Sequence, residues 1–105
     1  MQLTSFLENG RLTIALTGEI DHHRAKCYIE TIAAKIDAYA PSACILDFSE
    51  VTFVDSSGIA VVINALRRMA QAEGRLCLQS IGPQPMKVFK ASGIDKIVEI
   101  KETVK

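Results

Sequence analysis

The chain has 105 residues, of which 49% are hydrophobic and 23% are charged, the balance of a globular domain rather than a disordered chain. At this length folding buries roughly 65% of the unfolded chain's surface, enough for one core, so we predict a single domain over residues 1–105. Twelve Lys and Arg residues balance twelve Asp and Glu residues, which makes the net charge zero. A neutral chain lacks the concentrated basic face that binds nucleic-acid phosphates or an anionic membrane surface.

The N-terminal residues and the cysteines are what we expect of a cytoplasmic protein. Residues 1–4 lack the basic start and apolar stretch of a signal peptide, and the apolar run at residues 59–63 is too short to span a bilayer. Cys27, Cys44 and Cys77 include no closely spaced pair, and each lies among apolar neighbours. We expect three reduced core cysteines in a cytoplasmic protein, with neither a disulfide framework nor a zinc site.

The first part of the chain predicts a β-hairpin followed by a helix. A loose alternation over residues 3–7 and a strict one over residues 12–17 flank Asn9-Gly10, a dipeptide typical of two-residue hairpin turns. Asp21 is a good N-cap for the helix that follows. Apolar residues then recur at helical spacing until Pro41 ends the helix.

Strands and helices alternate in the rest of the chain. Residues 43–48 form a short, mostly apolar run, which suits a central strand covered on both faces. The remaining elements are a helix after residues 55–58 that ends at Gly74, a strand over 76–81, a short helix from the turn at 82–85 to Ser92-Gly93, and a strand over 97–100. This order predicts an α/β fold with a mostly parallel central sheet, an antiparallel N-terminal hairpin strand, and helices packed against the sheet.

An enzyme is the less favoured class of function. His22 and His23 are adjacent at a helix start, so their side chains point about 100° apart and cannot form the i, i+4 pair that binds zinc. We expect both to be exposed. The chain has no P-loop, GxGxxG or GxSxG motif. A nucleophilic role for Ser56 stays open as an alternative, but we assign no catalytic residue, no metal ligand and no cofactor.

The segment most informative about function is residues 53–59, Phe-Val-Asp-Ser-Ser-Gly-Ile. A purely structural interpretation is that Asp55 or Ser56 caps the following helix and that Gly58 relieves crowding in its first turn. Two hydroxyls and an acid exceed what one cap requires, and glycine in a helix costs about 1 kcal/mol relative to alanine. We therefore expect Gly58 to let the backbone of a partner, or a nucleotide, approach closely.

Ser56 is in a favourable position for phosphorylation. The unpaired N–H groups and the positive dipole end at a helix N-terminus stabilise an added charge of about −1.5 to −2. Asp55 beside it makes a phosphorylated surface more acidic still. Phosphorylation is therefore expected to leave the domain folded while it turns off an interface.

Two motifs resemble a known family. The first motif is residues 18–23 (Gly-Glu-Ile-Asp-His-His), which follow the hairpin, and the second is residues 55–58 (Asp-Ser-Ser-Gly), which open the second helix. Residues 91–94 (Ala-Ser-Gly-Ile), before the last strand, extend the resemblance beyond these two motifs. Together they are similar to the bacterial anti-sigma factor antagonists, which are stand-alone STAS domains (sulfate transporter and anti-sigma antagonist). The Asp-His-His extension is most similar to the sporulation branch, the antagonists of the anti-sigma-F factor. The resemblance covers essentially the whole chain, although Ile59-Ala60 stands where the family often has Leu-Gly.

The resemblance implies a protein-binding switch. In this family the antagonist binds an anti-sigma factor that is also a serine kinase of the GHKL ATPase type, and thereby releases a sigma factor. The kinase then phosphorylates the first serine of the motif, which is Ser56 here, and a PP2C-type phosphatase reverses the reaction. The partner-binding residues implied by the resemblance are Asp21, which meets a basic residue of the partner, together with Glu19, His22, Asp55, Ser57, Gly58 and Ile59.

Other functions of the same fold stay open. One is a different partner-switching cascade, in stress response, secretion control or a stressosome scaffold. Another is a STAS subunit of a lipid or anion transport complex. We expect a monomer that contacts neither nucleic acid nor membrane, and the sequence does not name the sigma factor or say whether the chain binds nucleotide.

Overall fold

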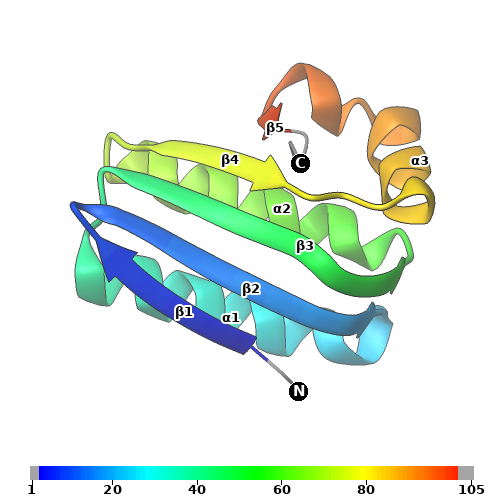
Figure 1. The fold of residues 1–105 in the computed structure, drawn as a ribbon, viewed down its shortest axis with the longest axis horizontal. Helices are drawn as coiled ribbons and strands as arrows, with labels where there is room; N and C mark the ends of the chain where they lie inside the picture. The colour runs from blue at the N-terminus through cyan, green and yellow to red at the C-terminus, as the bar shows by residue number, and fades with distance from the viewer. Residues whose placement is uncertain (1–2, 102–105) are drawn as a thin grey trace.

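The computed structural model describes residues 3–101, which form a five-stranded sheet with three α-helices (Figure 1). The strands, which lie in the sheet in chain order, are β1 (Leu3–Glu8), β2 (Arg11–Ile20), β3 (Ala43–Val54), β4 (Arg75–Gln79) and β5 (Glu99–Lys101). β1 pairs antiparallel with β2, and the other neighbours pair parallel. This confirms the predicted α/β fold with its mostly parallel sheet and antiparallel N-terminal strand.

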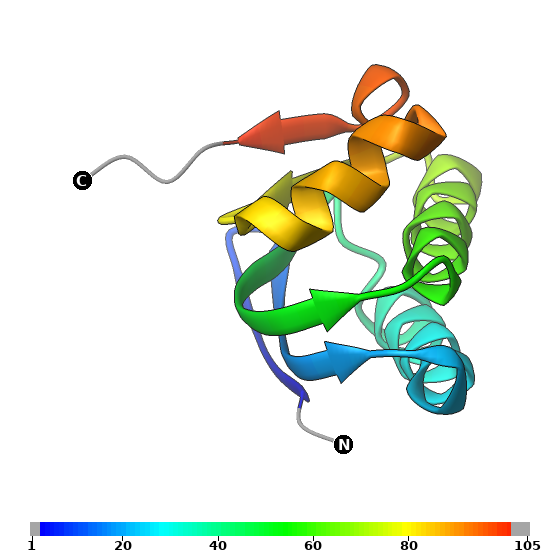
Figure 2. The ribbon, with the colours of Figure 1, turned by 90° about the vertical axis from the view of Figure 1, so that its right-hand side faces the viewer.

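Two of the helices cover one face of the sheet. α1 (His22–Tyr39) and α2 (Ser57–Gln71) lie side by side on that face, as Figure 2 shows. α3 (Pro83–Ser92) lies near the carboxyl end of β3, and a 3₁₀ turn, Ile94–Lys96, leads from it toward β5. No helix within residues 3–101 is long and apolar enough to cross a membrane.

The hairpin and the first helix follow the predicted local rules. Asn9 and Gly10 have φ of 54° and 77°, and Glu8 pairs with Arg11 across this two-residue turn. Two positive φ values are what a type I′ turn requires, and Asn-Gly adopts them readily. α1 ends at Tyr39. Ala40 follows it in the left-handed conformation, with φ 44°, and precedes Pro41.

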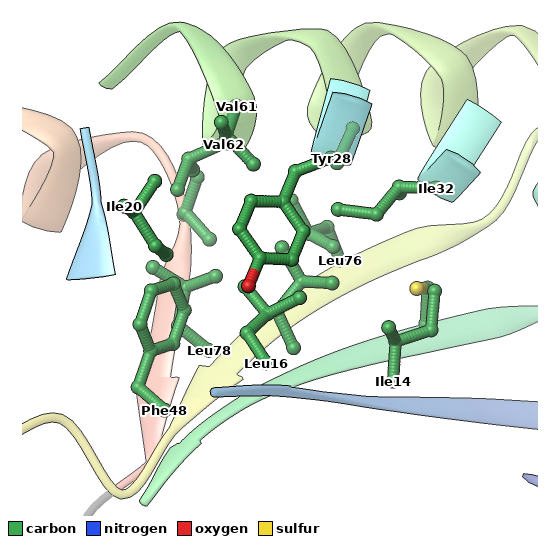
Figure 3. Close-up of a cluster of buried hydrophobic side chains, with 14 of the residues drawn as sticks. Ile14, Leu16, Ile20, Tyr28, Ile32, Phe48, Val61, Val62, Leu76 and Leu78 are labelled. Carbon is green, nitrogen blue, oxygen red and sulfur yellow. The ribbon is translucent and has the colours of Figure 1, made fainter. Parts of the chain in front are cut away.

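The core lies between the sheet and the helix pair α1–α2 (Figure 3). Tyr28 of α1 is fully buried at its centre, and its hydroxyl donates a hydrogen bond of 2.7 Å to the Thr17 carbonyl oxygen of β2. Burial raises the pKa of Tyr28, because the ionised phenolate loses its hydration. At the other end of the core, Phe48 of β3 and Phe89 of α3 pack edge to face at 5.4 Å between ring centres, which ties α3 to the sheet.

Some boundaries differ from the prediction. β2 continues past Thr17 to Ile20, and β3 continues past Phe48 to Val54. The pairing between them shifts register twice, between Ala15 and Thr17 and between Gly18 and Glu19. A bulge breaks the alternation of apolar and polar residues. When a strand continues through a bulge, the sequence pattern therefore predicts a strand that is too short. The last two strands also differ from the prediction: β4 ends at Gln79 rather than at residue 81, and β5 begins at Glu99 rather than at residue 97.

The role of Gly74 also differs from the prediction. The helix α2 ends at Gln71, and the left-handed residue after it is Glu73, with φ 58°, rather than the glycine. A Cβ on Gly74 would lie 2.8 Å from the Ser42 carbonyl oxygen and 2.5 Å from Met69 Cε. Glycine is therefore required here by lack of space, and not by backbone conformation.

The expectation of three core cysteines is correct for two of them. Cys44 and Cys77 are buried in adjacent strands, whereas Cys27 is exposed. The buried stripe of α1 consists of Ala25, Tyr28, Ile32 and Ile36, and Cys27 lies outside it. Burial raises the pKa of Cys44 to about 12, so this thiol carries almost no thiolate at neutral pH.

We predict that a thiol-specific reagent at about pH 8 modifies Cys27 rapidly in the native protein. Cys44 and Cys77 are expected to react only when the chain unfolds, because both are buried and burial raises the pKa of each. Mass spectrometry of time points, with and without denaturant, measures this. Cys27→Ser should remove the fast reaction, and fast native labelling of Cys44 would contradict the prediction.

Candidate functional site

The two sequence motifs meet at the carboxyl ends of β2 and β3. Ile20 and Val54 are paired residues of these neighbouring parallel strands, and the Asp55 N–H donates a hydrogen bond of 3.2 Å to the Ile20 carbonyl oxygen. Asp21 and Asp55 are the next residues, and each stands at the start of a helix. The fold therefore places side by side two segments that lie far apart in the sequence (Figure 2).

Asp21 caps α1, as the sequence predicted. Its Oδ1 accepts a hydrogen bond of 3.0 Å from the Arg24 N–H, and the side chain is half-buried. The Arg24 guanidinium donates to the Glu19 carbonyl oxygen at 3.4 Å, which stabilises the approach to the helix. The side chains of Glu19, His22 and His23 are exposed, as expected for the two histidines.

Asp55, rather than Ser56, caps α2. The Asp55 Oδ1 accepts a hydrogen bond of 2.7 Å from the Ser57 N–H, and its carbonyl oxygen accepts one of 3.0 Å from the Gly58 N–H. Ser56 already has helical backbone angles, φ −61° and ψ −21°, and its side chain makes no capping hydrogen bond. Ser56 is exposed, whereas Ser57 and Ile59 are half-buried. The capping requirement is thus met without the Ser56 hydroxyl, which projects at the surface.

The structure gives Gly58 an internal role in place of the expected close approach of a partner. Gly58 is buried, and a Cβ there would collide with Val54 Cγ1 and lie 3.7 Å from Ile20 Cγ2. The group that comes close is the Val54 side chain of the same chain. Glycine lets the first turn of α2 pack directly against the ends of β2 and β3.

Phe53, for which the sequence predicted no role, lies at the same edge. Its side chain is 40% exposed, and it pairs with Glu19 across β2 and β3. Paired residues of neighbouring strands project on the same side of a sheet, so an apolar ring and a carboxylate lie beside each other. The predicted strand ended at residue 48. If it had been extended to Val54, alternation would have placed Phe53 on the opposite side from the buried Val54 and so predicted its exposure.

Gln84 is a second residue at the site that no sequence motif predicted. Its Oε1 accepts a hydrogen bond from the Val54 N–H, and its Nε2 donates one to the Val54 carbonyl oxygen, each at 2.8 Å. The start of α3 is thereby joined to the end of β3. No local pattern predicts this contact, because the two residues are 30 positions apart.

The charges at this edge are mainly acidic. Glu19, Asp21 and Asp55 carry carboxylates, and Arg24 is the cation bonded to the same segment. Within residues 3–101 no three His, Cys, Asp or Glu side chains are grouped in a way that could hold a metal ion. The arrangement presents an exposed hydroxyl, an exposed aromatic ring and acidic groups on one edge of the sheet, which suits the docking of a protein surface.

The profile of the STAS domain family matches residues 6–105. The chain belongs to the STAS domain family. The anti-sigma F factor antagonist of Lysinibacillus sphaericus is 32% identical over 83 residues, which cover 79% of this chain and 71% of that protein. The anti-sigma-B factor antagonist of Listeria monocytogenes is 26% identical over 97 residues, 90% of this chain and 82% of the relative.

Two solved structures share the fold of this STAS domain. The anti-sigma factor antagonist SpoIIAA in its unphosphorylated form is 27% identical, with a TM-score of 0.84 over 99% of this chain and 90% of that one. The Bacillus cell fate determinant SpoIIAA in its phosphorylated form is also 27% identical, with a TM-score of 0.75 over 99% of this chain and 93% of that one. These relatives are regulatory proteins.

We predict that Gly58→Ala lowers the free energy of unfolding of this STAS domain by about 1–3 kcal/mol, because the added methyl group meets Val54. Helix propensity alone predicts the opposite, a gain of about 1 kcal/mol. Urea denaturation followed by circular dichroism distinguishes the two. The control is Ala60→Gly on the exposed face of the same turn, which should lose only the propensity difference. An unchanged or raised stability of Gly58→Ala would contradict the packing role.

Proposed function

We propose that this STAS domain is an anti-sigma factor antagonist that is switched off by phosphorylation of Ser56. The observation that carries the proposal is the exposed Ser56 hydroxyl at the start of α2, beside the loop of Glu19 and Asp21, with Asp55 in the capping role. The names of the curated relatives and the two solved forms of SpoIIAA support it.

The proposed partner is an anti-sigma factor that is also a serine kinase of the GHKL type. Asp21 pairs with a basic residue of this partner, and Glu19, His22, Asp55, Ser57 and Ile59 lie around it at the interface. Gly58 contributes indirectly, through the packing that fixes the loop. Binding of the partner releases a sigma factor, so the domain controls transcription through a protein intermediary in the cytoplasm, as a monomer of one domain and without contacting DNA or membrane.

Phosphorylation breaks the complex by local charge. The Ser56 Oγ attacks the γ-phosphorus of ATP, ADP leaves, and the hydroxyl proton passes to a base of the kinase. The phosphate adds about two negative charges at a helix start, where the helix dipole favours them, and the Asp55 cap does not use the Ser56 hydroxyl, so the fold is retained. Asp55 and Asp21 lie close together in the fold, and both already carry a negative charge. The added charge therefore dominates the potential within roughly 8–10 Å and displaces the partner, until a PP2C-type phosphatase removes it.

A pull-down from the native host, with and without phosphatase treatment, identifies the partner and tests its dependence on phosphate. Recovery of a GHKL kinase by the dephosphorylated domain supports the proposal. Recovery of a stressosome component, or of a transporter ATPase, would instead favour another partner-switching cascade or a lipid or anion transport complex. Labelling by a covalent serine probe would favour an enzyme with Ser56 as nucleophile.

We predict that the recovered kinase and ATP add one phosphate to the wild-type protein and none to Ser56→Ala. Removal of the hydroxyl eliminates the acceptor and leaves the Asp55 cap intact. Ser57→Ala, which removes the adjacent half-buried hydroxyl, should still accept one phosphate, and the control Ser49→Ala, at an exposed position of β3 outside the interface, should be phosphorylated like the wild type. Intact mass and peptide mapping measure the product, and a phosphate found on Ser57 or Thr52 would contradict the assignment.

We also predict that Ser56→Asp and Asp21→Lys each weaken binding to the kinase by about tenfold or more, which corresponds to about 1.4 kcal/mol. The first places a charge where the phosphate would stand, and the second reverses the charge that meets the partner. Glu30→Lys makes the same charge reversal at an exposed position of α1 away from the site, and should bind normally. Calorimetry measures the affinities, with circular dichroism as a check of folding, and unchanged affinity of both site variants would contradict the interface.

A further inference from the structure

Gln84 belongs to neither motif, yet its amide lies against Val54, the last residue of β3, two positions before Ser56. The amide accepts a hydrogen bond from the Val54 N–H and donates one to the Val54 carbonyl oxygen, both at 2.8 Å. In a β-sheet the backbone of a neighbouring strand supplies an acceptor for a residue's N–H and a donor for its carbonyl oxygen. The Gln84 amide supplies both to Val54. β4 pairs with β3 only as far as Asp47 opposite Gln79. The Gln84 side chain therefore takes the place of the missing strand beside Val54.

The backbone that presents Gln84 has little freedom. Gln84 lies in the first turn of α3 between Pro83 and Pro85, whose rings fix their φ angles, and Pro85 is buried. α3 is anchored by Phe89, which is fully buried and packs against Phe48. Because the side chain starts from a fixed backbone, the two hydrogen bonds to Val54 form at a smaller cost in conformational entropy.

Val54 is consequently restrained from two directions. On the β2 side, the Asp55 N–H holds the Ile20 carbonyl oxygen, and on the other side Gln84 holds both polar groups of Val54. Ser56 follows two residues later, and the Asp55 carboxylate on the Ser57 N–H continues the restraint into α2. A shift of the Val54 backbone would therefore be passed directly to Ser56.

We infer that Gln84 is a positioning residue for Ser56, and that it makes the presentation of the phosphoacceptor depend on α3. The consequence for phosphorylation rests on the proposed function, whereas the restraint of the loop does not. A displacement of about 1 Å at a reacting group can reduce a rate on the order of 100-fold, so a looser loop affects phosphoryl transfer more than docking.

The first test replaces the amide and keeps the length of the side chain. In Gln84→Met, amide hydrogen exchange at Val54, followed by NMR, is expected to become about tenfold faster or more, because the N–H loses its acceptor. With the pulled-down kinase and ATP, kcat is expected to fall by about tenfold or more while KM stays within about twofold, since Asp21 and its neighbours are unaltered. The matched control is Gln71→Met at the exposed end of α2, which should change neither quantity.

Gln84→Glu provides a signature that a space-filling role would not give. A protonated glutamic acid can accept from the Val54 N–H and donate to the Val54 carbonyl oxygen as Gln84 does, whereas an ionised carboxylate only accepts and faces that carbonyl unfavourably. The neutral form is thus favoured in the folded state, which raises the pKa of this glutamate above its ordinary value of about 4.3. The ionised carboxylate still accepts from the Val54 N–H, so the quantity to measure is the pKa of the introduced carboxyl. An NMR titration of Gln84→Glu should place this pKa above that of the exposed carboxyl introduced by Gln71→Glu.

The outcomes separate the inference from the proposed function. Unchanged Val54 exchange in Gln84→Met, or a pKa in Gln84→Glu no higher than that in Gln71→Glu, would overturn the restraint. Faster exchange with an unchanged kcat would overturn the positioning role. If the kinase phosphorylates the wild type elsewhere or not at all, the proposed function fails and the positioning of a phosphoacceptor fails with it, while the exchange measurements still decide whether Gln84 holds the loop.

Discussion

The parallel pairing of β2 with β3 is the constraint on which the rest of the structure depends. It continues through two register shifts to Ile20 opposite Val54, so both strands end at the same level. The helices that follow start side by side and pack on the same face of the sheet. Without that extension the loop at Asp21 and the loop at Ser56 would not share one edge, and a partner could not contact both.

The polar groups of the Ser56 loop are satisfied by side chains other than Ser56. Asp55 accepts from the Ser57 N–H, and the amide of Gln84 occupies both polar groups of Val54. Gly58 removes the methyl group that would separate α2 from the sheet. An exposed hydroxyl that no cap or ladder uses can gain a phosphate while the fold is retained, which is the physical requirement for a switch at this position.

Sequence periodicity predicted well wherever a structure depends on near neighbours in the chain. Asn9-Gly10 has the two positive φ values of its turn, and Asp21 caps α1 through the Arg24 N–H three residues on. The prediction was poorest where strands continue through bulges, because an inserted residue reverses the alternation. Cys27 was misplaced for a related reason: apolar neighbours in the sequence do not say which face of a helix a residue occupies, and the buried stripe of α1 excludes it.

The sequence by itself determined the order of the elements, the Asp21 cap and the two motifs that identify the STAS family. Only the tertiary structure decided that Gly58 faces Val54 and that Gln84 binds Val54. A local pattern reports interactions over one or two helical turns. The contact between Gln84 and Val54 spans 30 positions, and it exists only because β4 ends early and α3 packs against the uncovered edge of β3.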